Sequence, residues 1–183
     1  MLTKRIITTL MLNNGTLFRT KNFKPDYRFT LNFVDMWSVD EVILIDITRD
    51  LEFKDDSKKK FFQELLNISK NSYVPLTVGG GIRSLKDIEI LLKNGADKII
   101  LNTASLKDPK IIQLAAKEFG SQCVVVSVDA KLKNDDFFLM EKYGEQESKH
   151  NLIDYIKEIQ DNNVGEIFLQ SIDNDGSLLG YDF

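Results

Sequence analysis

Short apolar segments alternate with longer amphipathic segments along the whole chain. The short segments are rich in β-branched residues and nearly continuous in hydrophobicity, which is typical of strands buried on both faces. We therefore predict six strands, at Arg5–Leu12, Glu41–Ile47, Tyr73–Val78, Lys98–Leu101, Gln122–Val128 and Glu166–Ile172.

Apolar residues recur with helical spacing between these strands. Ser84 suits an N-cap, Gly95 suits a helix stop, and Pro109 is compatible with a first helical turn. The polar stretch Lys131–Lys149 is long enough for a functional loop and has the pattern of a short hairpin. We expect helices at Ser57–Lys70, Ser84–Asn94, Asp108–Gly120 and His150–Asn162, and a weaker one within Phe29–Val39.

Alternation of strands and helices predicts right-handed βαβ units around a parallel sheet in one α/β domain, residues 1–183. Glu41–Asp50 is similar in sequence to Glu166–Asp175, which suggests two related halves of four βα units each. The first half would be residues 1–120 and the second 121–183, with two βα units absent. The alternative is that buried strands are alike in composition without any duplication.

Composition narrows the class of protein. The 183 residues have a formal net charge of −4 and are 43% hydrophobic, as in ordinary soluble domains. The acidic balance argues against nucleic acid, and no apolar run approaches the roughly 20 residues that span a bilayer. The start of the chain lacks a signal-peptide pattern. Cys123 is the only cysteine and His150 the only histidine, so we expect a cytoplasmic protein without a metal site or cofactor.

Candidate chemistry follows the strands, because ligands of parallel α/β folds bind at the carboxyl ends of strands. Gly79–Gly81 would let a phosphate approach the backbone closely, near the N-terminus of the helix at Ser84. The alternative is a tight structural turn. Asn102 and Thr103 add hydrogen-bond donors at the end of the next strand.

Two carboxylates, Asp129 and Asp175, follow neighbouring strands and are candidates for general acid/base chemistry. The alternative is that each caps its own turn. We favour function for Asp129, which lies between an apolar strand and a long loop, and a structural role for Asp173. Arg19 and Lys131 are candidates for anion binding, although single surface charges are more often simply solvated.

Charged residues also stand at the starts of four strands, which places them at the opposite end of the sheet. Two cations and two anions there are enough for a closed ion-pair ring. From the pattern alone, ordinary solubilising charge is the simpler interpretation. The four residues are Arg5, Glu41, Lys98 and Glu166.

The ordered motifs resemble a known family, the cyclase subunit of imidazole glycerol phosphate synthase (HisF). They are Asp46-Ile47-Thr48, Thr77–Ile82, Asn102-Thr103-Ala104, Asp129-Ala130-Lys131 and Ser171–Gly176. The resemblance implies a (βα)8 TIM barrel, of which this chain supplies six of eight units. It also implies a HisH-like glutaminase partner that delivers ammonia through the barrel to a bis-phosphorylated aminoimidazole carboxamide nucleotide.

The resemblance assigns roles by position. Asp129 matches one of two catalytic aspartates, and Arg19 matches a lysine of the active-site loop. The four strand-start charges match a gate for ammonia, which replaces the solubilising interpretation. One phosphate site matches Gly81, Asn102 and Thr103, and part of a second matches Asp175 and Gly176.

Two departures from the family matter for function. Met11 stands where the family has its first catalytic aspartate, and a thioether cannot transfer a proton. The loop at Lys21–Thr30 is shortened. Both features resemble paralogues linked to acetamidino modification of surface sugars, which pass ammonia to a separate acceptor. The alternative is a non-catalytic truncated barrel that only binds the glutaminase.

A sheet of six strands would also leave its first and last strands as unpaired edges. We therefore expect either a truncated product or a chain that needs a partner for solubility.

Overall fold

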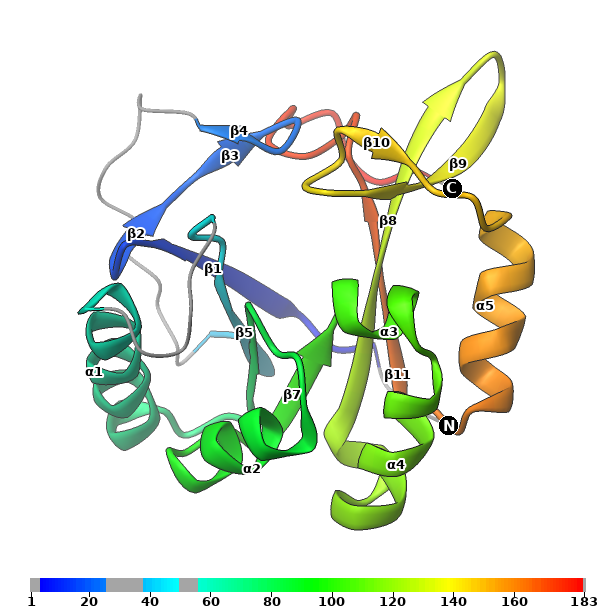
Figure 1. Ribbon diagram of the computed structural model, residues 1–183. Coiled ribbons are helices and arrows are strands. Elements are labelled where there is room, and N and C mark those ends of the chain that lie inside the picture. The colour runs from blue at the N-terminus through cyan, green and yellow to red at the C-terminus, as the bar shows by residue number, and fades with distance from the viewer. Residues whose placement is uncertain (1–3, 26–37, 50–55, 183) are drawn as a thin grey trace. The chain divides into compact units, whose positions relative to one another are not determined.

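A computed structural model describes residues 4–25, 38–49 and 56–182. The chain forms two compact units, one of Met1–Phe18 with Phe29–Ile100 and the other of Arg19–Arg28 with Leu101–Phe183. Figure 1 labels the helices and strands of both units. The weak helix expected within Phe29–Val39 lies outside the described residues, apart from positions 38 and 39.

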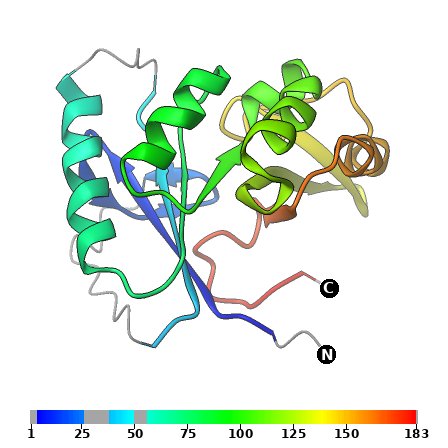
Figure 2. The same cartoon turned by 90° about the horizontal axis from the view of Figure 1, so that it is seen from below.

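The first unit is built on four parallel strands in the order β1, β5, β6, β7. Residues Ile7 to Leu12 of β1 pair in register with Glu41 to Asp46 of β5. Two helices, α1 and α2, lie on the same side of these strands (Figure 2). The bounds are β1 Ile7–Asn13, β5 Glu41–Asp46, α1 Asp56–Asn71, β6 Leu76–Gly79, α2 Leu85–Lys93 and β7 Lys98–Leu101.

The core of the first unit lies between the strands and these helices. The strands present alternate side chains to the helices, as the pleat requires. Burial of each Leu, Ile or Phe contributes roughly 1.5–3 kcal/mol, and the helical spacing of the apolar residues is what makes this burial possible. Side chains no more than 1% exposed include Val42, Leu44, Leu76, Val78, Phe61, Leu65, Ile88 and Leu91.

Helix α2 starts and stops where the sequence predicted. The Ser84 hydroxyl accepts a hydrogen bond from the Asp87 amide, and the Asp87 carboxylate accepts one from the Ser84 amide, which together form a capping box. Gly95, just past the C-cap Asn94, has φ +101°. This left-handed conformation is accessible to glycine without strain and ends the helix.

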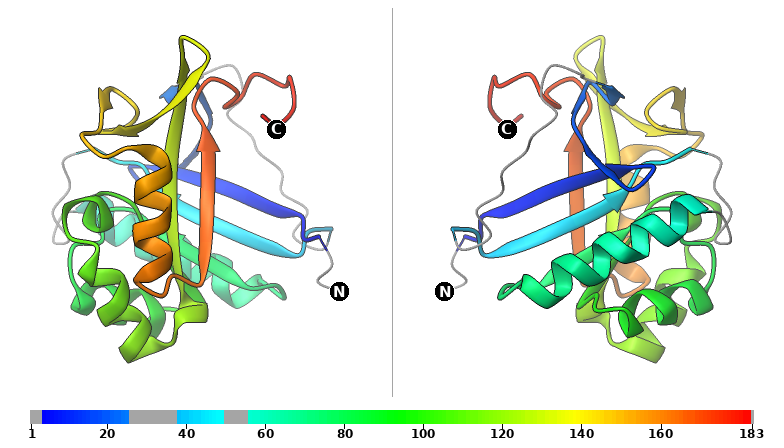
Figure 3. Two further views of the ribbon diagram at one scale, coloured as in Figure 1. Left: turned by 90° about the vertical axis from the view of Figure 1, so that its right-hand side faces the viewer. Right: turned by 90° about the vertical axis from the view of Figure 1, so that its left-hand side faces the viewer.

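The second unit pairs β8 with β11 in parallel and β8 with β9 in an antiparallel hairpin. The hairpin turns at Asn134 and Asp135, both with positive φ, and confirms the hairpin expected within Lys131–Lys149. Helix α5 lies alongside β8 and β11 (Figure 3). The bounds are β3 Thr20–Lys21, β4 Lys24–Pro25, α3 Thr103–Lys107, α4 Lys110–Phe119, β8 Val124–Lys133, β9 Asp136–Glu141, β10 Gln146–Glu147, α5 Leu152–Asp161 and β11 Glu166–Ser171.

Several short elements were not predicted, and two of them lie beside candidate residues. Strand β2 (Thr16–Phe18) pairs antiparallel with Met11–Asn13, so the expectation that the first strand is an unpaired edge was wrong over those residues. The turn at Asn14 and Gly15 has φ +53° and +72°, which matches the tight hairpin turns that asparagine and glycine favour. Helix α3 is a single five-residue turn between Asn102 and Asp108. Both elements are too short to show a hydrophobic period.

Strand β11 is less buried than the sequence predicted. Its residues are mostly half-buried, and Leu169 is 58% exposed. Among the described strands, β11 pairs with β8. Continuous hydrophobicity therefore predicted the strand correctly but not burial on both faces.

Within the second unit, the Tyr155 hydroxyl joins α5 to α3. Tyr155 is 1% exposed and donates to the Ser105 hydroxyl at 3.0 Å, and Ser105 donates to the carbonyl oxygen of Asn102 at 2.7 Å. Burial raises the pKa of Tyr155 to about 12, so the phenol stays neutral at physiological pH.

We predict that Tyr155→Phe lowers the free energy of unfolding by about 1 kcal/mol, the net value of one neutral hydrogen bond. The loss stays small because Ser105 keeps its own acceptor in Asn102. Urea denaturation measures the change, with Tyr73→Phe as the control because Tyr73 is 77% exposed. A variant as stable as the parent would show that the bond contributes nothing.

Candidate functional site

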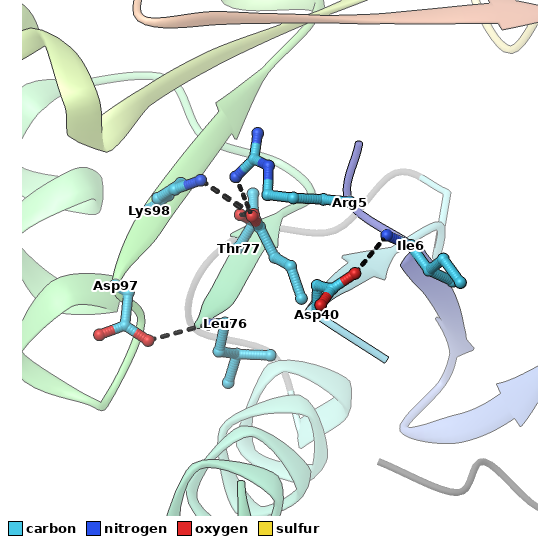
Figure 4. Close-up of polar contacts among 8 residues, drawn as sticks. Arg5, Ile6, Asp40, Leu76, Thr77, Asp97 and Lys98 are labelled. Atoms are coloured by element: carbon cyan, nitrogen blue, oxygen red, sulfur yellow. Dashed lines mark hydrogen bonds and ion pairs between the residues drawn. The ribbon is translucent and has the colours of Figure 1, made fainter. Parts of the chain in front are cut away.

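A buried carboxylate marks the N-terminal ends of the strands in the first unit. Glu41, the first residue of β5, is 1% exposed. It accepts from Arg5 Nη1 at 2.8 Å, from Thr77 Oγ1 at 2.6 Å and from Lys98 Nζ at 3.0 and 3.1 Å (Figure 4). A buried charge is stable only when it is paired and hydrogen-bonded, and this one has both kinds of partner.

Strand register explains how this cluster forms. Thr77 of β6 pairs directly with Lys98 of β7, so their side chains share one face of the sheet. Side-chain carboxylates also bind backbone amides at the starts of the neighbouring strands. The Asp40 carboxylate accepts from the Ile6 amide at 2.7 Å, and the Asp97 carboxylate accepts from the Leu76 amide at 2.8 Å (Figure 4). The result is a cluster of paired charges at the N-terminal ends of these strands.

The structure thus brings together three of the four strand-start charges, Arg5, Glu41 and Lys98. Glu41 is too buried to act as solubilising charge. Glu166 begins β11 in the second unit and is half-buried. Its participation in a gate stays a prediction.

The glycine turn lies at the opposite end of the same strands. Gly80 has φ +109°, and a Cβ there would lie 2.3 Å from the Asp46 carbonyl oxygen, so only glycine fits. Gly81 has φ +70° and is exposed. An exposed glycine after a strand is suited to accept an anion on its backbone.

The helix N-terminus near this turn is less available to an anion than the sequence suggested. The Asp87 carboxylate accepts from the Arg83 amide at 2.9 Å and from the Ser84 amide at 3.0 Å. A negative side chain therefore already occupies these donors. Anion binding here has to rest on the glycine turn itself.

Asp129 is the best-supported candidate for proton transfer. It lies on β8 and is 7% exposed. Its Oδ2 accepts from Asn102 Nδ2 at 3.0 Å, and its Oδ1 accepts from Ser127 Oγ and Gln170 Nε2, both at 3.1 Å. Burial raises the pKa of Asp129, and the three hydrogen bonds only partly oppose this rise. A raised pKa brings a carboxyl group closer to the range in which general acids and bases operate.

The residues around Asp129 refine the sequence analysis. Asn102, predicted to hold phosphate, uses its side-chain amide on Asp129. Thr103 starts α3 and is exposed. Sequence reasoning missed Ser127 and Gln170. Their signal was a polar residue inside an otherwise apolar strand, Val124–Val128 for one and Glu166–Ile172 for the other.

Asp175 and Gly176 anchor a loop in the second unit. The Asp175 carboxylate accepts from Thr20 Oγ1 at 2.8 Å and from the Phe23 amide at 3.0 Å. Gly176 has φ +63°, and a Cβ there would lie 2.4 Å from the Thr20 carbonyl oxygen. These contacts indicate a structural role for the Asp175 carboxylate, although it binds the Thr20–Phe23 segment and not, as the alternative expected, its own turn. The phosphate roles of Asp175 and Gly176 stay predictions.

Three further candidate residues, Arg19, Asp173 and Lys131, all lie in the second unit. Arg19 directly precedes β3 and is half-buried. Asp173 accepts from the Leu132 amide at 2.8 Å, as the structural interpretation expected. Lys131 lines a cavity of about 790 Å³ in the second unit, together with Lys21, Lys24 and Lys133.

Met11 lies on β1 in the first unit and is half-buried. It pairs with Ile45 of β5 and with Phe18 of β2. It shares a strand face with Thr9 and Asn13, because side chains alternate along β1, whereas Leu10 and Leu12 on the other face are buried. Within the described residues, no three His, Cys, Asp or Glu side chains are placed to hold a metal ion. No helix among those residues is long and apolar enough to cross a membrane.

Comparison with known proteins decides the family. The model of the histidine biosynthesis protein family matches residues 6–183. The chain belongs to this family. It is 35% identical, over its whole length, to the imidazole glycerol phosphate synthase subunit HisF of Saccharolobus solfataricus, of which it covers 73%. It is 38% identical to the HisF subunit of Lactococcus lactis (100% of this chain, 71% of the relative) and 36% identical to that of Flavobacterium psychrophilum (99% and 72%).

Membership confirms the resemblance drawn from the motifs and the α/β class with its mostly parallel sheet. The matched region contains Met11, Asp129 and the glycine turn.

We predict that Gln170→Met raises the pKa of Asp129 further, because it removes a donor that stabilises the charged form. Carbon-13 NMR titration of the aspartate carboxyls measures this directly. Gln146→Met on β10, an exposed position, is the matched control. A lowered Asp129 pKa in Gln170→Met would contradict the hydrogen-bonding account.

Burial of Asp129 also has a defined effect on stability. Its folded-state pKa lies above its unfolded value, so the folded state binds more protons between those two values. The contribution of Asp129 to stability therefore falls as the pH rises through that interval.

Proposed function

We propose that this chain is the ammonia-receiving, HisF-type subunit of a glutamine-dependent amidotransferase pair. Its partner would be a HisH-like glutaminase, its substrate a phosphorylated small molecule, and its setting the cytoplasm. The buried Arg5–Glu41–Lys98 cluster is the observation that carries the proposal. Family membership and the names of the HisF relatives support it.

The cluster has the chemistry expected of an ammonia entrance. Its two cations disfavour passage of ammonium, whereas neutral ammonia pays no such electrostatic penalty. The side chain of Arg5 is 44% exposed and that of Glu41 is 2% exposed, so the cluster extends from the surface to the buried Glu41 carboxylate. Thr77 adds a hydroxyl that can hydrogen-bond to a passing amine.

The chemistry of the site supports a specialised role. Asp129 has the burial and raised pKa of a general acid or base. Met11 removes the second carboxylate that the family resemblance implies, and loss of one such group typically costs about 10²–10⁴ in rate. A candidate entrance with three of its four charges clustered, together with a single acid/base group, favours ammonia transfer to another acceptor over full cyclase chemistry. We therefore propose the paralogous role in acetamidino modification of surface sugars.

We predict that the chain fails to restore growth of a histidine auxotroph that lacks the cyclase. Met11→Asp should raise ammonia-dependent turnover of the bis-phosphorylated nucleotide by roughly 10²-fold or more, because it restores a second proton-transferring group. The assay follows consumption of that substrate by the purified chain with ammonium chloride.

Met11→Asn is the matched control, because it has the same shape as the aspartate without its acidity. Robust growth supported by the unmodified chain would overturn the paralogue proposal. No turnover by any variant, together with binding of a glutaminase, would favour the alternative of a non-catalytic barrel that only holds its partner.

We predict that Glu41→Gln uncouples ammonia delivery from glutamine hydrolysis. The substitution removes the charge that holds Arg5 and Lys98 in place, so ammonia should escape before it reaches the acceptor. The measurement is ammonia released to bulk solvent per glutamine hydrolysed, with a HisH-like glutaminase bound. Glu89→Gln, which alters an exposed pair with Lys93 on α2, is the control. Unchanged coupling in Glu41→Gln would remove the cluster from the ammonia path.

A further inference from the structure

A buried lysine lies beneath the glycine turn of the first unit. Lys58, in the first turn of α1, has a side chain 3% exposed, and its Nζ lies 2.8 Å from Asp46 Oδ2, a side chain 2% exposed. The same ammonium donates to the Gly80 carbonyl oxygen at 3.0 Å and lies 4.7 Å from the centre of the Phe61 ring. Lysine is almost never this buried without such partners.

The electrostatics of helix α1 do not explain why a lysine stands at position 58. The N-terminal turn of a helix carries positive partial charge, which disfavours a cation there. Lys58 has an anion and a carbonyl oxygen as compensation, and both come from strand ends, Asp46 from β5 and Gly80 from the turn after β6. The contacts with the strands therefore set the position of Lys58.

The turn is held from two sides. Asp46 packs so closely against Gly80 that a Cβ there would lie 2.3 Å from the Asp46 carbonyl oxygen. Lys58 holds the Gly80 carbonyl by a charge-assisted hydrogen bond, which is stronger than a neutral one. Apart from chain neighbours, the atoms nearest to a Cβ built on Gly81 are Lys58 Nζ at 3.5 Å and Cε at 3.7 Å. The cation thus lies directly below the exposed glycine.

We propose that Lys58 is a positioning residue that holds the Gly79–Gly81 turn, through the Gly80 carbonyl, in the shape that receives a substrate phosphate at Gly81. This role rests on the proposed function for the phosphate. The Asp87 carboxylate occupies the Arg83 and Ser84 amides, so the helix N-terminus does not supply them to an anion. A glycine turn held in shape by Lys58 would bind the anion without them. Asp46 balances the charge of Lys58, so the pair is neutral overall when no ligand is bound.

The test separates holding the turn from balancing the buried charge. Lys58→Met alone leaves Asp46 buried without its cation and can fail by unfolding. The double variant Asp46→Asn, Lys58→Met removes both charges, keeps similar volumes and leaves an oxygen to accept from Thr48. Lys70→Met, at an exposed position on the same helix, is the matched control.

Two properties are measured on each folded variant, with its melting temperature. One is the backbone order of the Gly80 and Gly81 amides by nitrogen-15 relaxation, and the other is the dissociation constant of inorganic phosphate from shifts of those amides. In the double variant we expect order parameters to fall toward about 0.6 and phosphate to bind roughly tenfold more weakly, at a melting temperature close to the parent's. Lys70→Met should match the parent in both.

Each outcome has one interpretation. A turn as ordered in the double variant as in the parent overturns the role of Lys58, and so does unchanged phosphate affinity. A loosened turn with weakened phosphate binding supports it. A loosened turn in a protein whose parent binds no phosphate at Gly81 supports Lys58 as the holder of the turn and contradicts the proposed phosphate site.

Discussion

A buried carboxylate must find hydrogen-bond donors or a cation, and three such carboxylates organise this molecule. Glu41, Asp46 and Asp129 are all 7% exposed or less and all lie in parallel strands. Leaving any of them unpaired would cost several kcal/mol, a large fraction of the stability of an ordinary domain. The partners that each one requires therefore fix which segments of the chain must come together.

Two of the three carboxylates belong to one strand. Glu41 is the first residue of β5 and Asp46 is the last, and the alternation of the strand places them on opposite faces. Glu41 binds the strands that start beside it through Arg5, Thr77 and Lys98, whereas Asp46 binds α1 through Lys58. One six-residue strand is thus fixed at both ends. It ties the candidate ammonia entrance to the candidate phosphate turn within a single rigid element.

Much of the fold could be predicted because the hydrophobic periodicity of strands and helices is visible in short stretches of sequence. Six strands and four helices follow from apolar runs and helical spacing, and Ser84 and Gly95 act as predicted. Lys58 could not be found this way. It stands in a run of three lysines at positions 58–60, and only the phase of α1 against β5 decides that this one is buried. Sequence carries no direct record of that phase.

The candidate site shows the same division. Asp129 was predictable because it directly follows the apolar run Val124–Val128, although β8 continues past it to Lys133. Its partners Asn102, Ser127 and Gln170 come from three different segments, and their meeting depends on register between strands distant in sequence. Asp175 was also predicted from its place after a strand, yet the Thr20–Phe23 segment occupies its carboxylate. Position alone therefore cannot separate a working carboxylate from a structural one.

The partners of each carboxylate decide what it can do. Glu41 and Asp46 are each paired with cations, Arg5 and Lys98 for the first and Lys58 for the second. Asp129 has neutral donors only among the partners that the structure gives it, so desolvation dominates and its pKa rises. A half-buried carboxylate at position 11 would need hydrogen-bond donors of its own. Methionine needs no such donors, and it has no ionisable proton to transfer. Under the proposed function, Asp129 is the carboxyl group that remains of the pair implied by the family resemblance, and one such group suits the transfer of ammonia better than ring closure in several proton-coupled steps.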